Sequence, residues 1–341
     1  MKTLFRIFSF LATTVFILCT VACDDLLTGK NNQQNKNENQ QNVNYEIVTD
    51  IPDFPADEEI AAFTFVDNKF SNGINWAGLR SSPYGFEQDG TGKKFPSVSN
   101  FDTYASKMEA NYPGSNGAFV WIVGVVEEDT WNCNLNFPLK NIKMDKVNDV
   151  KKDQNNAFLD MASQKDYDVW LQVESGDADI CELAWLILNR YKNYPCVKGF
   201  GVDVEWYKPE GTNGKGSKIT NAVAEKLNKI VKMVNPNYTV FLKHWETKWM
   251  PPSYRSDLIF VTDSQGLRSI DNYKRAMEKW ASSFSNNPVF LQIGYDRDEE
   301  EVWGKLENPT KDLGTYISQD FINKNPIGII WVDFTLRRAL K

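Results

Sequence analysis

The chain has 341 residues, a formal net charge of −7 at pH 7 and a single histidine, His244. This acidic balance offers no basic surface for nucleic acid, and one histidine argues against a histidine-based metal site or a Ser-His-Asp triad. Neither a G-x-G-x-x-G turn that opens a helix nor a G-x-x-x-x-G-K-[ST] loop occurs, so we expect no cofactor and no metal. The length suits one β/α barrel, which commonly needs about 250 residues.

Residues 1–22 have the pattern of a secretion signal. Lys2 and Arg6 precede an apolar run from Ile7 to Cys19, which is too short for a spanning helix. The stretch from Leu18 to Cys23 resembles a bacterial lipobox, which implies cleavage before Cys23 and attachment of lipid to it. Ordinary signal cleavage, with Cys23 as an incidental cysteine, is the alternative.

Residues 23–44 form a polar linker between this signal and the rest of the chain. Its low-complexity stretch from Asn31 to Asn42 is rich in Asn and Gln and cannot bury a core, so we expect a flexible tether. Residues 45–341 then form the folded domain. Together these features predict an extracytoplasmic lipoprotein, anchored to the membrane at the bacterial cell surface or the periplasmic face.

Strand-like apolar segments alternate with helical patterns along the folded domain. The expected strands are Gly73–Arg80, Ala118–Gly124, Asp168–Glu174, Val197–Trp206, Tyr238–Trp245, Leu258–Gln265, Val289–Tyr295 and Gly328–Phe334. The expected helices are Phe101–Ala110, Asn155–Gln164, Ile180–Tyr191, Ile219–Val234, Ile270–Ser283 and Thr315–Asn323. This alternation predicts an α/β fold, a single (β/α)8 TIM barrel. An open Rossmann-like sheet fits the alternation too, but the lack of a phosphate loop favours closure.

The fourth expected strand carries the clearest chemical signal. Side chains alternate along a strand, so Gly201, Asp203 and Glu205 share one face while Val202 and Val204 share the other. Two carboxylates so close repel when both are ionised, and one is then held protonated near neutral pH, as a general acid requires. The alternative is a structural pair that binds helix N-termini and loop amides.

Polar and aromatic side chains also end most of the other strands. In a β/α barrel these ends meet at one face and form the active site. A pocket with tryptophan, arginine, lysine and carboxylates suits a polar, ring-shaped ligand such as a sugar. We therefore predict that the following residues bind substrate: Arg80, Trp121, Gln172, Glu174, Lys243, Trp245, Asp263, Gln265, Gln292, Trp331 and Asp333.

The stretch from Lys198 to Glu205 resembles the signature of glycoside hydrolase family 18, found in chitinases and endo-β-N-acetylglucosaminidases. That signature runs Asp-Gly-apolar-Asp-apolar-Asp-any-Glu on the fourth barrel strand. The matching positions are Gly199, Phe200, Val202, Asp203 and Glu205. Lys198 and Gly201 stand at the first two acidic positions. The stretch from Gly328 to Trp331 resembles the family's last strand.

The resemblance implies a role for each of several residues. Glu205 would be the general acid, and Asp203 would hold the substrate's 2-acetamido group as it attacks the anomeric carbon, a substrate-assisted exception to the two-carboxylate scheme. Tyr295 would orient the same acetamido group, and Trp331 would lie under the sugar at the cleavage site. Because position 201 is not acidic, the partner that shares a proton with Asp203 in the family is missing.

These observations predict a monomeric, lipid-anchored glycoside hydrolase that acts on a polysaccharide or glycan, with N-acetylhexosamine linkages preferred. One alternative is a barrel glycosidase of another family, with Glu174, Asp263 or Asp333 as nucleophile or base. Another is a catalytically silent barrel that binds glycans, which the presence of Glu205 argues against. A third is a two-lobed solute-binding lipoprotein, which a single barrel would exclude.

Overall fold

The computed structural model describes residues 44–82, 97–208 and 216–340. The predicted signal sequence, Cys23 and nearly all of the predicted tether lie outside the described residues. The described part of the chain belongs to one compact unit with the bounds Val43–Lys341. Among its helices, none has both the length and the apolar character needed to cross a membrane.

Eight parallel strands close into a barrel, which confirms the predicted fold class. Around the ring they follow the order β1, β10, β9, β8, β7, β6, β5 and β2, and pairing of β1 with β2 closes it. The strands are β1 (Gly73–Arg80), β2 (Asn116–Val126), β5 (Asp168–Val173), β6 (Val197–Asp203), β7 (Thr239–Lys243), β8 (Ile259–Thr262), β9 (Val289–Ile293) and β10 (Pro326–Val332). A single closed barrel is not the two-lobed fold of a solute-binding protein.

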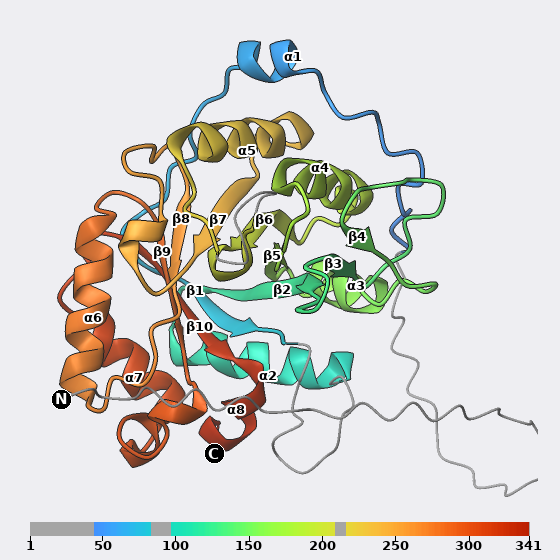
Figure 1. The fold of residues 1–341 in the computed structure, drawn as a ribbon. Helices are drawn as coiled ribbons and strands as arrows, with labels where there is room; N and C mark the ends of the chain where they lie inside the picture. Colours follow the sequence, from blue (N-terminus) through green and yellow to red (C-terminus); the bar gives the residue numbers. More distant parts are fainter. Residues whose placement is uncertain (1–43, 83–96, 209–215, 341) are drawn as a thin grey trace, which may run out of the picture. The chain divides into compact units, whose positions relative to one another are not determined.

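Helices surround the strands (Figure 1). They are α2 (Val98–Asn111), α3 (Asn156–Gln164), α4 (Ile180–Tyr191), α5 (Asn221–Val234), α6 (Ile270–Ser283) and α7 (Pro309–Ser318). Helix α7 begins and ends earlier in the chain than predicted, because Pro309 occupies its first turn, where the missing N–H costs nothing. Helix α8 (Asp333–Ala339) follows β10 directly, so Asp333 and Phe334 are helical and not part of the last strand.

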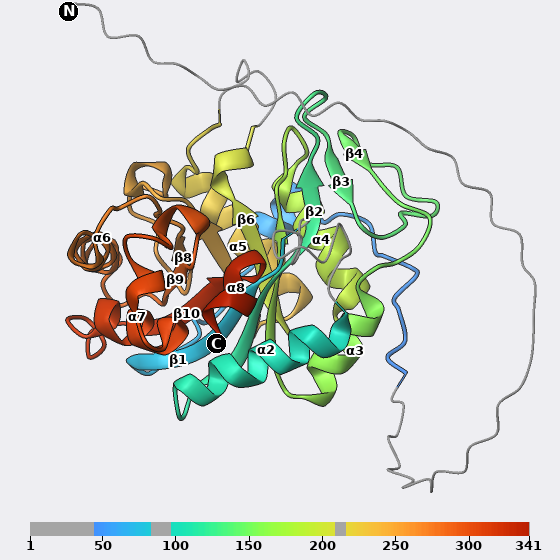
Figure 2. The same cartoon turned by 90° about the horizontal axis from the view of Figure 1, so that it is seen from below.

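Three short elements were not predicted. Strand β3 (Cys133–Leu135) pairs antiparallel with β2, and β4 (Val147–Asn148) pairs with β3. Both lie beside β2, outside the ring of parallel strands (Figures 1 and 2). Helix α1 (Asp57–Ala62) precedes the barrel. The hairpin extends β2 beyond the barrel mouth and so shapes one side of the end where the strands finish.

Two separate clusters of buried apolar side chains form the core. The larger lies between the strands and the helices and includes the outward residues Val169, Leu171 and Val173 of β5. The smaller fills the inside of the barrel and contains Trp76, Trp170, Phe241 and Phe290. Glycines make room for these rings, because a Cβ at Gly201 would lie 2.0 Å from Cζ of Phe241 and one at Gly328 would lie 2.5 Å from Cδ1 of Phe290. The aromatic rings therefore plug the barrel below the ends of the strands.

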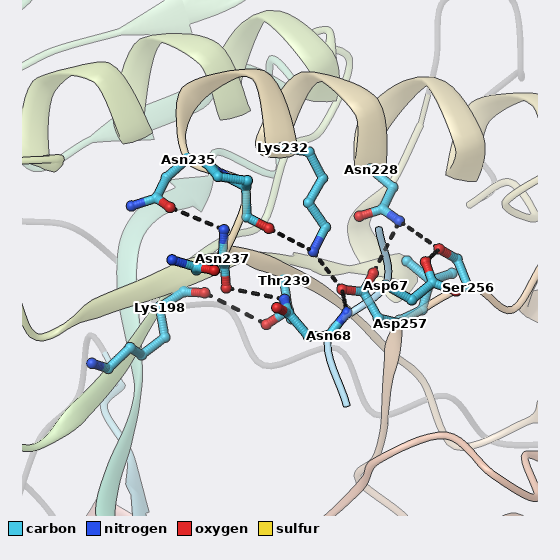
Figure 3. Close-up of polar contacts among 12 residues, drawn as sticks. Asp67, Asn68, Lys198, Asn228, Lys232, Asn235, Asn237, Thr239, Ser256 and Asp257 are labelled. Atoms are coloured by element: carbon cyan, nitrogen blue, oxygen red, sulfur yellow. Dashed lines mark hydrogen bonds and ion pairs between the residues drawn. The ribbon is translucent and has the colours of Figure 1, made fainter. Parts of the chain in front are cut away.

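A buried ion pair ties the segment before β1 to the N-terminal end of the barrel. Lys232 of α5 pairs with Asp257, which precedes β8, and both side chains are fully buried. Asp257 also accepts hydrogen bonds from the backbone N–H of Asn68 at 3.0 Å and from the side chain of Asn228 at 3.2 Å (Figure 3). This network lies at the end opposite the predicted site, where barrel residues serve stability.

Candidate active site

The C-terminal ends of five barrel strands bring five charged side chains together. Arg80 ends β1, Glu174 follows β5, Asp203 ends β6, Lys243 ends β7 and Asp263 follows β8. Each points inward because it continues the alternation that places Trp76, Trp170 and Phe241 inside the barrel. All five are buried. Buried charges are stable only when they are paired, so their mutual contacts define the site.

Lys243 bridges two aspartates. Its Nζ lies 2.7 Å from Oδ2 of Asp203 and 2.6 Å from Oδ2 of Asp263. Burial disfavours the ammonium, but the two carboxylates outweigh that cost and raise the pKa of Lys243. Burial raises the pKa of Asp203, while Lys243 opposes the increase. The lysine therefore lets two neighbouring carboxylates share a buried site.

Arg80 lies beside Glu174 and also beside Asp203. Its Nη2 lies 3.3 Å from Oε1 of Glu174 and 3.9 Å from Oδ2 of Asp203. Burial and the nearby Asp203 charge raise the pKa of Glu174 to about 7, against the opposing effects of Arg80 and Lys243. Arg80 and Glu174, the predicted substrate-binding residues at the ends of β1 and β5, thus both lie beside Asp203.

Glu205 lies on a single 3-10 turn, η2 (Val204–Trp206), because strand β6 ends at Asp203 and does not continue to Trp206 as predicted. The turn leaves the side chain of Glu205 exposed at the mouth of the barrel. Glu205, Asp203 and Asp263 each have a carboxylate oxygen within 4.8 Å of the other two. Partial desolvation by surrounding protein, followed by the charge of Asp203, raises the pKa of Glu205 to about 7. A proton is therefore available at Glu205 near neutral pH.

A pocket of about 740 Å³ opens beside these carboxylates. Glu205 and Asp263 line one part of it, and Trp245 and Gln265 line another. Trp245 keeps 44% of its surface exposed and stacks on His244 with ring centroids 4.0 Å apart. A pocket of this size, with an exposed indole and a few polar groups, fits the general form of a small-molecule site.

Several buried polar atoms of the site have no hydrogen-bond partner within the described part of the chain. They are both amide atoms of Gln172, Oδ1 of Asp203 and Oδ1 of Asp263. Buried polar groups normally have partners, so such a group indicates a bound water, ion or ligand. The amide and the two carboxylate oxygens are groups that hydrogen-bond the hydroxyl and N–H groups of a sugar.

Three further predicted residues, Gln292, Tyr295 and Asp333, lie at the edge of this cluster. The side-chain amide of Gln292 donates to the hydroxyl of Tyr295. Burial raises the pKa of Tyr295 above its usual value, followed by the charge of Asp263, whereas Lys243 and Arg80 oppose the increase. Asp333 accepts hydrogen bonds from N and Oγ of Ser82, at 3.0 and 2.7 Å, and joins the end of β10 to the end of β1. Burial raises its pKa to about 7.

Trp121 and Trp331 do not line the site, and the predicted stacking role of Trp331 does not fit its position. Both belong to the outer core between strands and helices and are essentially unexposed. Trp121 stacks on Phe158 at 3.5 Å between ring centroids, and Trp331 packs against Trp303 and donates to Thr335. The reason is strand alternation, because Ile330 faces the inside of the barrel and Trp331 must then face outward.

Other residues of the pocket were missed by sequence reasoning. They are Glu246, Lys248, Lys279, Trp280 and Arg297. Glu246 and Lys248 directly follow the predicted fifth strand, so their place on a strand-end loop was a usable signal. Lys279 and Trp280 lie on α6, and only the packing of that helix against the barrel brings them to the pocket.

The triad Asp203, Glu205 and Asp263 has the close oxygen spacing of a cation site. However, the ammonium of Lys243 already lies between Oδ2 of Asp203 and Oδ2 of Asp263. A divalent ion on the same oxygens would be repelled by this buried cation. The positive charge that balances these carboxylates is thus the ammonium of Lys243.

No protein-family model and no curated protein matches the chain. The structure is similar to the β-glucuronidase of Parabacteroides merdae, with 10% sequence identity and a TM-score of 0.45 over 78% of this chain and 34% of that chain. It is similar to the endo-β-mannanase/endo-β-glucanase of Prevotella bryantii, with 13% identity and a TM-score of 0.44 over 75% of this chain and 44% of that chain.

A third similar structure is the family 99 endo-α-mannosidase of Bacteroides thetaiotaomicron, with 14% identity and a TM-score of 0.38 over 77% of this chain and 83% of that chain. The chain thus spans about a third of the length of the first protein and under half of the second. All three are named as enzymes that act on glycosides. At such identities and scores they carry no inference about the activity of this chain, and the family 18 resemblance stays a prediction.

Proposed function

We propose that the chain is a glycoside hydrolase that acts on a glycan containing N-acetylhexosamine. The observation that carries this proposal is the position of Glu205. Its carboxyl group has a pKa of about 7, lies at the mouth of a barrel beside a pocket, and has oxygens of Asp203 and Asp263 within 4.8 Å. A protonated carboxyl beside ionised carboxylates is the arrangement that glycosidic bond cleavage uses.

In this mechanism Glu205 donates its proton to the leaving glycosidic oxygen. The free Oδ1 of Asp203 accepts a hydrogen bond from the acetamido N–H, so that the acetamido oxygen attacks the anomeric carbon as the glycosidic bond breaks. Water then opens the cyclic intermediate, and the carboxylate of Glu205 takes a proton from that water. Lys243 favours the charged form of Asp203 in this role, because its ammonium contacts the other oxygen, Oδ2.

A direct carboxylate nucleophile is the second candidate, and the carboxylate spacing favours it. Separations of about 5–5.5 Å characterise retaining enzymes with a nucleophile, and about 6.5–9.5 Å characterise inverting enzymes. The nearest oxygens of Glu205, Asp203 and Asp263 lie within 4.8 Å of one another, so these carboxylates are not held at the wide spacing of an inverting enzyme. Asp263 or Asp203 would then attack the anomeric carbon itself. Both candidates retain the configuration of the sugar.

The substitution Glu205→Gln tests the proposal because it keeps the shape of the side chain and removes its proton. Turnover of chito-oligosaccharides should fall by about 10²–10⁴, the usual contribution of general acid catalysis. The loss should be smaller for a nitrophenyl glycoside, whose leaving group needs no proton. Near-normal turnover of the natural glycan by this variant would end the assignment.

The substitution Asp203→Asn and a thiazoline mimic of the cyclised intermediate separate the two mechanisms. Substrate assistance requires inhibition of the wild-type chain by the thiazoline, together with a large loss in Asp203→Asn. Loss of activity in that variant without thiazoline inhibition would instead support the direct nucleophile.

We also propose that the enzyme acts as a monomer outside the cytoplasm, held at a membrane by lipid on Cys23. The support is the lipobox-like stretch from Leu18 to Cys23 and the polar linker of residues 23–44. Such a tether would keep the mouth of the barrel within reach of extracellular polymers.

A further inference from the structure

Two tryptophans form a pair on the side of Glu205 away from the pocket. Trp131 lies on the turn between β2 and β3, and Trp206 ends the 3-10 turn that carries Glu205. Their ring centroids are 6.2 Å apart and their planes meet at 32°. Both indoles are only half-buried. The pair is thus a partly exposed aromatic surface next to the proposed acid.

Backbone hydrogen bonds from a third loop hold this pair in place. The N–H of Asp177 donates to the carbonyl of Trp131 at 2.8 Å, and the N–H of Gly176 donates to the carbonyl of Trp206 at 2.8 Å. Gly176 permits this approach, because a Cβ there would lie 2.1 Å from the Trp131 carbonyl oxygen. The loops after β2, β5 and β6 therefore form one connected support, which limits the entropy lost when a ligand binds.

Lys208 adds an unmet polar group to the aromatic surface. Its side chain is 2% exposed, and Nζ lies 2.6 Å from the centroid of the Trp131 ring. Within the described ranges no group accepts a hydrogen bond from Nζ. The ammonium thus packs on the Trp131 ring and feels the charge of Asp177, and a polar ligand that lies across the tryptophans would supply the hydrogen-bond acceptor that it lacks.

The order of strands places the tryptophan pair and the pocket on opposite sides of Glu205. The pair lies over the ends of β2, β5 and β6. The pocket is lined by residues that follow β7 and β8, by α6 and by the loop after β9. Glu205, at the end of β6, stands between them. A chain of sugars that filled both regions would therefore pass over the acid with units on either side of the cleaved bond.

We propose that Trp131, Trp206 and Lys208 form a second glycan-binding region, and that the enzyme cleaves within a polymeric chain and not at its end. Pyranose rings present apolar C–H faces that pack on indole rings, and their hydroxyls supply the acceptors that Lys208 needs. This inference rests on the proposed function for its class of ligand. It adds the length of the substrate and the position of the cleaved bond.

The test measures binding in the Glu205→Gln chain, so that no probe is consumed. The probes are chitobiose and chitohexaose, with mannobiose and mannohexaose in parallel, titrated by calorimetry. At least one hexaose should bind more tightly than its biose. Trp131→Ala or Trp206→Ala should then lower hexaose affinity about fivefold, because each removes an aromatic contact, and should reduce the ratio between hexaose and biose.

Two controls distinguish a binding surface from loop packing. Trp131→Phe and Trp206→Phe keep an aromatic face and should recover most of the hexaose affinity. Trp185→Ala removes a half-buried indole from α4, where it donates to the carbonyl of Pro52, and should leave the ratio unchanged. Equal affinity for hexaose and biose, or a ratio that both alanine variants leave intact, would overturn the proposal.

Product analysis with the wild-type chain tests the position of cleavage separately. Internal products from chitohexaose or mannohexaose support cleavage within the chain, and release of single terminal units contradicts it. If no probe is cleaved but the tryptophan-dependent ratio is present, the proposed hydrolysis fails while the binding region stands. The two proposals therefore fail by different measurements.

Discussion

The ammonium of Lys243 lies 2.7 Å from Oδ2 of Asp203, its partner in the register between β6 and β7. In the family 18 signature, which the stretch from Lys198 to Glu205 resembles, the position of Gly201 is acidic and shares a proton with the position of Asp203. Here position 201 is glycine, and Phe241 fills the space above it. Lys243, two residues after Phe241 on the same face, stabilises Asp203 by charge and not by a shared proton.

Replacing Lys243 tests this relationship. Lys243→Met removes the cation that bridges the buried carboxylates of Asp203 and Asp263, which should cost about 3–5 kcal/mol in the free energy of unfolding. Without the lysine the pKa of Asp203 rises further, so stability should be present at low pH and lost as pH rises through that value. Urea unfolding at about pH 5 and about pH 8 measures the difference.

The matched control for this variant is Lys248→Met, which removes an exposed lysine that pairs with Glu246 at 2.9 Å. It should change neither the stability nor its pH dependence appreciably. A Lys243→Met chain as stable as the wild type at both pH values would show that the bridge is not needed to hold the two aspartates.

The pH dependence of hydrolysis should follow the proton of Glu205. Because its pKa is raised to about 7 and only the protonated form donates, kcat/KM should fall as pH rises through about 7. Glu174 and Asp333 also have pKa values of about 7, so loss of a proton from either could cause the same fall in kcat/KM. The residual activity of Glu205→Gln should no longer fall near pH 7, whereas the activity of Asp333→Asn should still do so. If the fall in kcat/KM is unchanged in Glu205→Gln, it arises from another group.

Because Gly201 and Phe241 are in contact, the effects of substituting them on the free energy of unfolding should not be additive. A Cβ at position 201 would lie 2.0 Å from the Phe241 ring, so Gly201→Ala should cost about 1–3 kcal/mol through overpacking. In a Phe241→Leu chain the same substitution should cost less, by about 0.5 kcal/mol or more. Denaturant unfolding of the four chains completes the cycle. Additive costs would mean that the ring moves aside freely.

The ion pair between Lys232 and Asp257 should be a stability device without influence on binding. Lys232→Met leaves Asp257 buried and without its cation, which should cost about 3–5 kcal/mol. Lys226→Met, on the same helix, breaks an exposed pair with Asp57 and a contact with the Phe54 ring, and should cost about 0–1 kcal/mol. Equal thermal shifts in the two variants would contradict the difference in burial.

Lipid attachment at Cys23 can be tested by partition between detergent and water. The wild-type chain, produced with its first 22 residues in a bacterial host, should enter the detergent phase, and Cys23→Ser should stay in the aqueous phase with the barrel still folded. Equal partition of both chains would remove the lipoprotein proposal and leave the glycosidase proposal untouched.

The barrel could be predicted because its signal is repeated along the chain. Each strand is a short apolar run, and two helices, Ile180–Tyr191 and Ile270–Ser283, were predicted with the bounds that the structure has. Strand alternation also placed Arg80, Gln172 and Asp203 correctly on the inner face. Whether a side chain faces the inside or the outside of the barrel can thus be predicted from its place in the strand, without knowledge of the packing.

Other positions of the site could not be predicted from alternation or resemblance. Trp331 was assigned to the site on the strength of a resemblance, but its neighbour Ile330 takes the inward position. Glu205 reaches the mouth through a 3-10 turn and not through a longer strand. The pairing of Trp131 with Trp206 depends on two loops that are distant in sequence. Such contacts arise from tertiary packing, which local patterns do not record.

The aromatic plug inside the barrel controls how protons reach the buried aspartates. Trp76, Trp170 and Phe290 contact one another, with ring centroids 5.1 to 5.7 Å apart, one step below the polar layer that contains Gln172 and Gln292. Among the described residues, these rings separate Asp203 from the opposite end of the barrel, so water reaches it from the mouth. A ligand that covered the mouth would therefore also separate Asp203 and its neighbours from bulk water.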